Sequence, residues 1–97
     1  MHDLSAFQRD VLYVLAGLET PYGLAVKSEL ETYYEGEVNH GRLYPNLDEL
    51  VERGYVEKGE IDRRTNSYDL TDEGWQLLAD RRRWETGNLE NEERAAV

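Results

Sequence analysis

The chain contains no cysteine, only two lysines (Lys27 and Lys58) and only two histidines (His2 and His40) among its 97 residues. The lack of cysteine excludes disulfides, a thiol redox switch and a zinc site with cysteine ligands. The two histidines do not have the spacing of metal ligands, so we expect no metal and no cofactor. No apolar run approaches the length of a membrane span, and the N-terminus lacks the pattern of a signal peptide. We therefore expect one domain, located in the cytoplasm and not in a membrane.

Acidic residues outnumber basic ones by 21 to 11, which gives a formal net charge of −10. The excess is spread along the chain, with −4 on residues 1–35, −3 on residues 36–70 and −3 on residues 71–97. Uniform excess acid with few lysines indicates a protein solvated in concentrated salt, where a Debye length of roughly 3 Å screens repulsion between like charges. The alternative is an acidic protein of ordinary salt conditions whose partner is another protein.

The most informative segment is 39–50, which reads N-H-G-R-L-Y-P-N-L-D-E-L. Asn39 suits the N-cap of a helix. Apolar residues follow at the spacing of one helical face, at Leu43, Leu47, Leu50 and Val51. The pattern predicts an amphipathic helix that begins after Asn39 and ends before Gly54, which suits the C′ position.

The opposite face of this helix carries groups that suit DNA. Arg42 can form paired hydrogen bonds with guanine, and an asparagine such as Asn46 can pair with adenine. Gly41 lets the backbone approach a phosphate closely, and the N-terminus of a helix attracts anions. The candidate DNA-binding residues of the segment are Asn39, His40, Gly41, Arg42, Tyr44 and Asn46. Taken alone, the segment is equally consistent with an ordinary amphipathic helix that has a solvated polar face.

A β-hairpin is predicted directly after this helix. Strand candidates lie at residues 55–60 and 67–70, separated by I-D-R-R-T-N. Asn66 is expected to take a left-handed conformation at the hairpin tip. Arg63 and Arg64 could reach a phosphate or the minor groove from this turn, although a solvated turn has the same sequence character. The further candidate DNA contacts are Lys58, Arg63, Arg64, Thr65, Asn66 and, as a phosphate contact or an ordinary surface lysine, Lys27.

Apolar periodicity predicts three further helices. The first follows a cap at Asp3 or Ser5, and the second spans about 22–34 and closes at Gly36. The last begins after a cap at Thr71. The order of elements predicts an α+β winged helix-turn-helix with a three-helix core, a two-stranded β-wing and a C-terminal dimerisation helix.

The last helix is expected to end at about residue 85 or beyond. Residues 1–86 would form the DNA-binding and dimerisation domain, and residues 87–97, which lack periodicity, would form a frayed or disordered tail. The first and last helices together offer more apolar surface than one small core needs, which predicts a homodimer. The interface candidates are Leu4, Phe7, Val11, Trp75, Leu78 and Trp84. The alternative use of the two tryptophans is the core of the single chain.

The segment N-H-G-R-L-Y-P-N-L-D-E-L-V-E-R-G-Y-V resembles the signature of PadR-type winged-helix transcriptional regulators, approximately S-x-G-x-[IL]-Y-P-x-L-x-x-L-x-x-x-G-[LY]-[IV]. The later Y-D-L-T-D-E-G is similar to the family's Y-x-L-T-x-x-G. The resemblance covers roughly residues 4–85. Asn39 stands where many members have serine, and a single C-terminal helix stands where they have a longer helical region. The resemblance implies a homodimer that binds double-stranded DNA. The lysine-poor composition resembles the haloarchaeal branch, which includes chromosomal regulators and small proviral repressors.

An enzyme is not expected, because the sequence has no nucleophile–base pair, phosphate-binding glycine loop or metal cluster. The first candidate function is a sequence-specific DNA-binding transcriptional regulator, most simply a dimeric repressor that binds an inverted-repeat operator at high salt. The second is an acidic protein-interaction module on a winged-helix scaffold, with a DNA mimic as one form. The local sign of charge distinguishes them, since DNA binding needs basic residues gathered on one face. Glu49, Glu60 and Asp62 lie close enough to the candidate arginines to matter.

Overall fold

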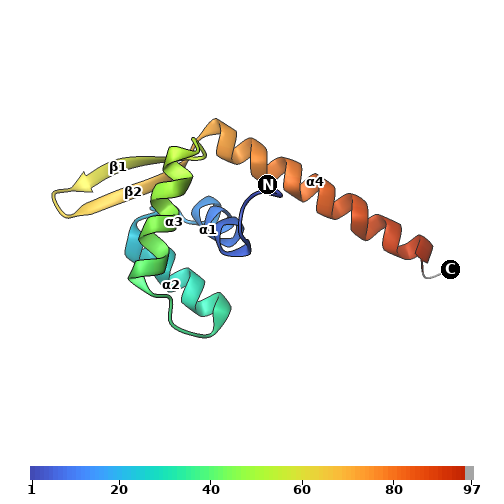
Figure 1. The fold of residues 1–97 in the computed structure, drawn as a ribbon, viewed down its shortest axis with the longest axis horizontal. Coiled ribbons are helices and arrows are strands. Elements are labelled where there is room, and N and C mark those ends of the chain that lie inside the picture. The colour runs from blue at the N-terminus through green and yellow to red at the C-terminus, as the bar shows by residue number, and fades with distance from the viewer. Residues whose placement is uncertain (96–97) are drawn as a thin grey trace.

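The structure, a computed structural model, describes residues 1–95, and the side chains through residue 90. Its elements follow in the order α1 (Ala6–Gly17), α2 (Gly23–Tyr34), α3 (His40–Glu52), β1 (Val56–Asp62), β2 (Thr65–Leu70) and α4 (Asp72–Ala95). Helices α1, α2 and α3 pack together, the β1–β2 hairpin projects from one side of them, and α4 projects toward the opposite side (Figure 1). This is the predicted winged helix-turn-helix, and the hairpin is its wing.

Helices α1, α3 and α4 begin where the sequence supplies a capping side chain, whereas α2 follows Tyr22 without a side-chain cap. Asn39 Oδ1 accepts a hydrogen bond from the Gly41 backbone N–H at 2.6 Å, and Thr71 Oγ1 accepts one from Gly74 N–H at 3.1 Å. Ser5 caps α1. Each cap satisfies a backbone N–H that has no partner within its helix. The predicted caps of α3 and α4 are confirmed, and α1 uses the second of its two predicted candidates.

The two glycines expected to end helices behave differently. Gly54 follows α3 with a φ of 83°, in the left-handed region that favours glycine, as predicted. Helix α2 ends at Tyr34, as predicted, and the Gly36 backbone N–H donates to the carbonyl oxygen of Glu31 at 3.3 Å. The residue that takes the left-handed conformation is Glu35, with a φ of 56°, and not the glycine. The backbone N–H of Glu35 donates to the carbonyl oxygen of Glu31, and this bond closes the last turn of α2.

The wing is a tighter hairpin than expected. Asp62 lies opposite Thr65 in the antiparallel register, so that Arg63 and Arg64 alone form the turn. The prediction of a left-handed Asn66 at the tip was wrong, because Asn66 lies within β2 and outside the left-handed region. Asp62 shapes the turn instead, since its Oδ1 accepts a hydrogen bond from the backbone N–H of Arg64 at 2.9 Å.

One hydrophobic core joins the elements. Its buried members are Leu4, Phe7, Val11, Leu12, Leu15, Val26, Leu30, Val38, Leu43, Leu47, Leu50, Val56, Tyr68 and Leu78. Leu43, Leu47 and Leu50 are fully buried, which confirms the predicted inward face of α3. This face holds α3 against the other helices and leaves the remaining faces for function.

The core also corrects the predicted dimer interface. Four of its six candidates are at most 5% exposed and lie in the core of the single chain: Leu4, Phe7, Val11 and Leu78. They are therefore largely covered within the single chain, although Leu78 also lines a cleft between α1 and α4 that a second chain could reach. The physical reason is size, because a small domain needs most of its apolar side chains for its own core. Trp75 and Trp84 are 51% and 59% exposed and stay available as interface residues.

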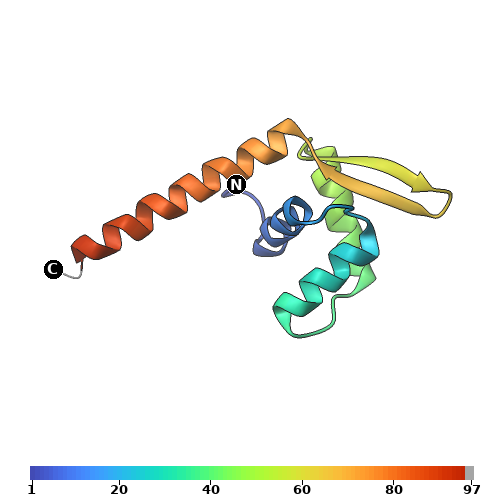
Figure 2. The ribbon, with the colours of Figure 1, turned by 180° about the vertical axis from the view of Figure 1, so that it is seen from behind.

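Helix α4 is longer than the expected minimum. It continues through Ala95, so that residues 87–95 are helical where an irregular tail was expected. This segment lacks apolar periodicity, but a solvated helix needs none, and its leucine, glutamates and arginine are good helix formers. The second half of α4 extends beyond the rest of the chain in both views (Figures 1 and 2). Residues 96–97 lie outside the described residues, and a domain boundary at residue 86 stays a prediction.

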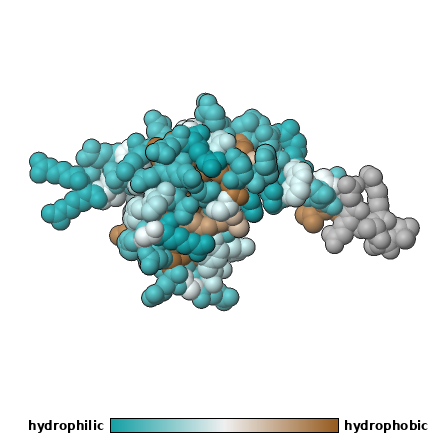
Figure 3. Space-filling model, in the orientation of Figure 1, coloured by the Kyte–Doolittle hydropathy of each residue, from teal (hydrophilic) through white to brown (hydrophobic). Residues whose placement is uncertain are grey.

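The surface is mainly hydrophilic on the face drawn in Figure 3, including the projecting tip of the wing. Hydrophobic colour is confined to scattered patches between the hydrophilic side chains. None of the helices within residues 1–95 combines the length and the apolar character that crossing a bilayer requires.

Candidate nucleic-acid interface

A groove of about 360 Å³ lies between the start of α2, the first half of α3 and the wing. Nine residues line it: Tyr22, Gly23, Leu24, His40, Tyr44, Arg64, Thr65, Asn66 and Tyr68. Five of the predicted DNA-binding residues therefore meet here, two from the helix and three from the wing. Three of the lining residues carry no local sequence signal for a binding site: Tyr22, Gly23 and Leu24. Their position at the groove depends on the packing of α2 against α3.

Tyr44 is held by the start of α2. Its ring stacks on the His40 imidazole, with the ring centroids 5.6 Å apart. The phenol end lies directly over Gly23, and a Cβ at that position would collide with the Tyr44 ring. A side chain at position 23 would therefore displace the end of the Tyr44 ring from this position. Tyr44 is half-buried, so its contacts support a role in placing α3 against α2.

Arg63 and Arg64 form the exposed tip of the wing. Within the described part of the chain, neither has a carboxylate at ion-pair distance. The neighbouring Asp62 is engaged in the turn, and the hydrogen bond from the Arg64 backbone N–H is the main cause that lowers the pKa of its carboxyl group. Both guanidinium groups can therefore reach a phosphate without breaking an ion pair.

The two lysines are already paired. Lys58 Nζ lies 3.8 Å from Asp48 Oδ1, and Lys27 Nζ lies 2.8 Å from Glu31 Oε2. The same Glu31 oxygen accepts the backbone N–H of Val38 at 2.9 Å, so the lysine first and this N–H second hold the pKa of Glu31 below its usual value. A surface pair contributes at most about 1 kcal/mol, so DNA could compete for Lys58. The shared contacts of Lys27 favour a structural role at the α2–α3 connection.

The other side of α3 faces α1. The Arg42 guanidinium carbon lies 4.0 Å from the centroid of the Phe7 ring. The Asn46 amide is bonded at both ends, since Oδ1 accepts from Gln8 Nε2 at 3.0 Å and Nδ2 donates to the Arg42 backbone oxygen at 2.7 Å. To read a base, Arg42 must leave the ring and Asn46 must give up both hydrogen bonds. The adenine-reading role of Asn46 stays a prediction, and these contacts weigh against it.

Gln8 is a site residue that the sequence analysis missed. It is only 5% exposed, so that a polar side-chain amide lies buried beside the apolar core in the described part of the chain. A signal was present, because Gln8 follows Leu4 by four residues and precedes Val11 by three, at a core position of the apolar stripe of α1. A polar side chain at such a position usually has a dedicated partner.

Most acidic side chains near the groove and the wing have a hydrogen-bond or ion-pair partner within the chain. Asp48 pairs with a lysine, Glu49 accepts a hydrogen bond from a glutamine and lies 3.9 Å from an arginine, and Asp62 is bonded within its own turn. Glu60 is exposed on β1. The first half of α3 carries no acid, and Arg42 is its formally charged side chain. The surface formed by the first half of α3 and the wing tip is therefore basic, although the chain as a whole is acidic.

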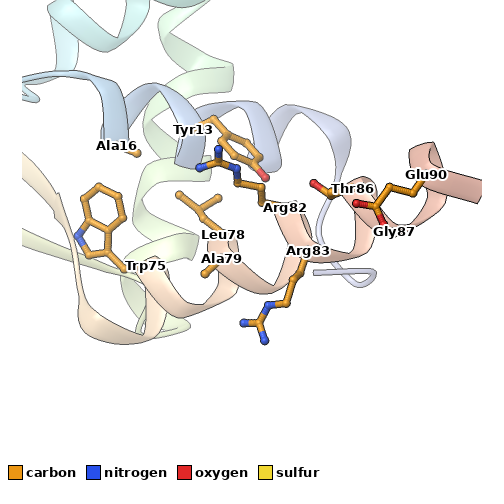
Figure 4. A pocket seen from close by; sticks show the side chains of 10 residues that line it. All are labelled: Tyr13, Ala16, Trp75, Leu78, Ala79, Arg82, Arg83, Thr86, Gly87 and Glu90. Carbon is orange, nitrogen blue, oxygen red and sulfur yellow. The ribbon is translucent and has the colours of Figure 1, made fainter.

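A second hollow, the α1–α4 cleft, lies away from the wing. Its volume is about 670 Å³ (Figure 4). Its lining residues are Tyr13, Ala16, Trp75, Leu78, Ala79, Arg82, Arg83, Thr86, Gly87 and Glu90. Arg82 reaches toward Tyr13 of α1, whereas Arg83 points away from α1. Burial, more than the nearby Glu85 carboxylate, raises the pKa of Tyr13.

The two exposed tryptophans lie on different sides of α4. Trp75 lines the α1–α4 cleft, whereas Trp84 lines a separate hollow together with Met1 and His2. Nine residues at 100° each place them about half a turn apart on the helix. The guanidinium carbon of Arg81 also lies over the Trp84 ring, 4.4 Å from the ring centroid. The two predicted interface anchors therefore do not form a single stripe.

Residues 11–80 match the family model described as the transcriptional regulator PadR-like family. The chain belongs to this family. It is a DNA-binding transcriptional regulator of the winged-helix type, and the predicted class, a regulator and not an enzyme, is confirmed by the PadR-like match.

Solved structures of RosR resemble this PadR-like chain along most of its length. The complex structure of hsRosR-S1 is 52% identical with a TM-score of 0.87, and the match covers 97% of this chain and 87% of that one. The complex structure of hsRosR-SG is 57% identical with a TM-score of 0.85, covering 89% and 76%. H. salinarum RosR grown from NaBr is 47% identical with a TM-score of 0.81, covering 98% and 97%. No curated protein matches the chain. The likeness to a haloarchaeal regulator confirms the predicted branch of the family.

Proposed function

We propose that the chain is a dimeric repressor that binds an inverted-repeat operator at high salt and acts on DNA in the cytoplasm. The observation that carries this proposal is the groove that joins the first half of α3 to the wing. The arginines that flank it have no ion-pair partner among the side chains that the structure describes, those of residues 1–90. The first half of α3 would enter the major groove, and the wing would lie along the adjacent backbone. Complex structures of the similar RosR proteins are known, and their 52–57% identity makes the same mode of action the natural proposal here.

The side chains divide into three proposed roles. Arg42 would read a base, while Arg63 and Arg64 would contact phosphates or a narrow minor groove. Gly41 is exposed at the start of α3, where a missing side chain lets a phosphate approach the helix N-terminus. Further contacts are proposed for the residues that border the groove or the start of α3: Asn39, His40, Tyr44, Thr65 and Asn66. Lys58 would contribute once DNA competes with its carboxylate partner.

A second copy of the chain is the proposed occupant of the α1–α4 cleft. Trp75 and Tyr13 are half-exposed at its edges, and the second half of α4 extends beyond the rest of its own chain. Burial of these rings against a second α4 would remove apolar surface from water. Within the described residues Arg82 has no ion-pair partner, so it would suit an acid of the second copy. Trp84, on the other side of α4, would extend this interface.

A two-fold dimer accounts for the form of the operator. Such a dimer presents two α3 helices, and half-sites lie about 34 Å apart or at a multiple of that distance when two recognition helices bind one face of DNA. Repression by occlusion is then the simplest action, because a bound dimer covers a promoter without needing any further surface.

The test has two parts. Light scattering in molar KCl should give twice the 11.3 kDa mass of one chain. Duplexes selected by the protein from a random library should contain an inverted repeat that the dimer protects from cleavage. Arg64→Ala should weaken binding to the selected duplex, while the control Arg9→Ala removes an arginine of α1 that lines neither the groove nor the α1–α4 cleft and should not. A stable monomer, or equal effects of the two substitutions, would contradict the proposal.

The alternative, an acidic protein-interaction module or DNA mimic, receives less support. A mimic needs carboxylates spaced like phosphates on the surface where its partner binds. Here Asp48, Glu49 and Asp62 have partners within the chain, and the wing tip presents two arginines. Failure to retain any duplex at any salt concentration would favour this alternative.

A further inference from the structure

Gln8 connects α1 to the DNA-facing helix α3. Both donors and the oxygen of its buried side-chain amide are engaged in hydrogen bonds. Oε1 accepts the backbone N–H of Ser5 at 3.1 Å, and Nε2 donates both to Asn46 Oδ1 at 3.0 Å and to Glu49 Oε2. Two of these partners lie on α3, 38 and 41 residues away in the sequence. The amide therefore fixes two neighbouring turns of α3 relative to α1.

The contact continues along α3 in both directions. Asn46 Nδ2 donates to the backbone oxygen of Arg42, one turn toward the start of the helix. Glu49 Oε1 lies 3.9 Å from Arg53 Nη2, one turn toward its end, and Arg53 Nη1 is 2.9 Å from an oxygen of Asp3. Arg42, Asn46, Glu49 and Arg53 thus form one row of α3 that faces α1, and Gln8 holds the middle of that row.

We propose that Gln8 is a positioning residue for DNA recognition, which holds Asn46 against α1 and keeps the Glu49 carboxylate turned away from the DNA. The proposal rests on DNA binding through α3, as argued above. Gln8 itself is too deeply buried to touch DNA, so its effect acts through α3. Asn46 is then also a positioning residue, and its contacts in this structure account for its orientation without a base.

The charge of Glu49 explains why the hydrogen bonds of Gln8 to α3 are needed. Glu49 is the acid nearest the middle of α3 on this row, and its side chain is 46% exposed. Without the Gln8 donor, one carboxylate oxygen loses its partner and is better solvated when the side chain turns outward. An outward carboxylate would meet the phosphates of a bound duplex, and like charges at short range repel even in concentrated salt. The hydrogen bond from Gln8 to Glu49 therefore keeps one negative charge away from the binding surface of a highly acidic chain.

The test is a rescue experiment with a duplex selected by the wild-type protein in molar KCl. Gln8→Met keeps the shape and burial of the side chain but removes its hydrogen bonds. We expect it to lower the affinity about tenfold, an effect equivalent to about 1.4 kcal/mol, with the ranking of operator variants unchanged. Adding Glu49→Gln should restore most of that affinity, because the amide carries no charge. If Gln8 served only stability, Glu49→Gln would give no rescue, since it also weakens the contact with Arg53.

Ser5→Ala is the matched control. It removes the other half of the capping box, in which Ser5 Oγ accepts the Gln8 backbone N–H at 3.1 Å, and leaves the contacts to α3 in place. It should lower the melting temperature without changing the affinity of the folded protein. In the free protein, the side-chain amide protons of Gln8 should exchange slowly with solvent, because the group is buried and both protons are donated to α3, and Asn46→Ala should make them exchange faster. Asn46→Ala serves as a second variant at the exposed end of the contact, with an affinity loss similar to that of Gln8→Met.

Three results would overturn the inference. They are a folded Gln8→Met variant that binds like the wild type, a loss that Glu49→Gln does not rescue, and Gln8 amide protons that exchange fast in the wild type. A wild-type chain that binds no duplex while its Gln8 amide stays protected would overturn the DNA-binding proposal, and with it the role of Gln8 in recognition, but not the contact itself.

Discussion

Replacing Arg42 by alanine tests how α3 recognises a sequence. In the free chain the guanidinium rests on the Phe7 ring, 4.0 Å from the centroid. Reading guanine means that it leaves this ring for the two acceptors of the base edge in the major groove. The structure therefore sets a competition between an internal contact and a base contact, and the net effect is their difference.

The magnitude follows from the two contacts. A paired hydrogen bond to guanine discriminates by about 1–3 kcal/mol, and an exposed contact between an arginine and an aromatic ring is worth about 0.5–1 kcal/mol. The middle values of these ranges, about 2 and about 0.75 kcal/mol, differ by about 1.25 kcal/mol per half-site. A dimer with two half-sites should lose about 2.5 kcal/mol when Arg42 is replaced by alanine, or about 70-fold in affinity.

The assay is titration of the selected duplex and of duplexes with one base pair changed per half-site. The wild type should distinguish these duplexes, and Arg42→Ala should lose the preference at one position only. Arg42→Lys is the matched control, because it keeps the charge without the forked donor group, and it should lose the preference while it keeps more of the affinity. A uniform loss on every duplex would make Arg42 a phosphate contact, and no loss would mean that its guanidinium stays on Phe7.

Three further predictions concern the wing, the dimer and acid stability. The double variant Arg63→Ala with Arg64→Ala should weaken binding to all sequences by similar factors and leave the ranking of operators nearly unchanged, and wild-type-like binding would remove the wing from the contact model. Trp75→Glu should convert the dimer to a monomer in light scattering and weaken operator binding with it, whereas a persistent dimer would move the interface away from the α1–α4 cleft. The pKa of Glu31 is lowered in the folded chain from an ordinary value of 4.5. The contribution of the Glu31 carboxylate to stability is therefore present above pH 4.5 and is lost as the pH falls through its lowered pKa in the folded chain. Glu31→Gln should flatten the acid side of the profile of melting temperature against pH. An unchanged profile would show that the bonds of Glu31 to Lys27 and Val38 do not matter for stability.

Much of α3 and of the fold could be predicted because the signals are local. An N-cap at Asn39, leucines at helical spacing and a glycine at position 54 each act within one or two turns of the chain, and the structure has all three. The order of helices and strands then left the winged helix as the arrangement. The longer α4 was missed because its last turns have no apolar face, which a solvated helix does not require.

The side of α3 that faces α1 could not be predicted in the same way. The sequence places Arg42 and Asn46 on polar faces of α3, but the partners that bind them, Phe7 and Gln8, come from a helix more than 30 residues earlier. Only the packing of α1 against α3 brings these groups together. Helical periodicity likewise predicts that an apolar face is covered, but not whether a second chain or the same chain covers it. This is why Leu78 was predicted at the interface, whereas the structure places it in the core of the single chain.

The wing shows a third limit. Asn66 and Asp62 are both residues that favour turns, and local preference does not decide which of them shapes a hairpin. The strand register decides, because it pairs Asp62 with Thr65 and so makes Arg63 and Arg64 the two residues of the turn. The two arginines themselves were expected in the turn, and they lie there.

The central claim is that an acidic winged-helix dimer binds DNA in concentrated salt, and calorimetric titration of the selected duplex across a KCl series tests it most directly. A regulator with 6–10 phosphate contacts loses roughly 10³–10⁵ in affinity between 50 and 200 mM salt. This chain offers few basic groups to each half-site and surrounds them with acids, so it should release few counterions on binding, and acids that face the DNA should take up cations. We predict two chains per duplex, a shallow or reversed salt dependence at low KCl, and measurable affinity in molar KCl, where repulsion is screened. A steep, monotonic loss with no binding left at molar KCl would contradict the claim.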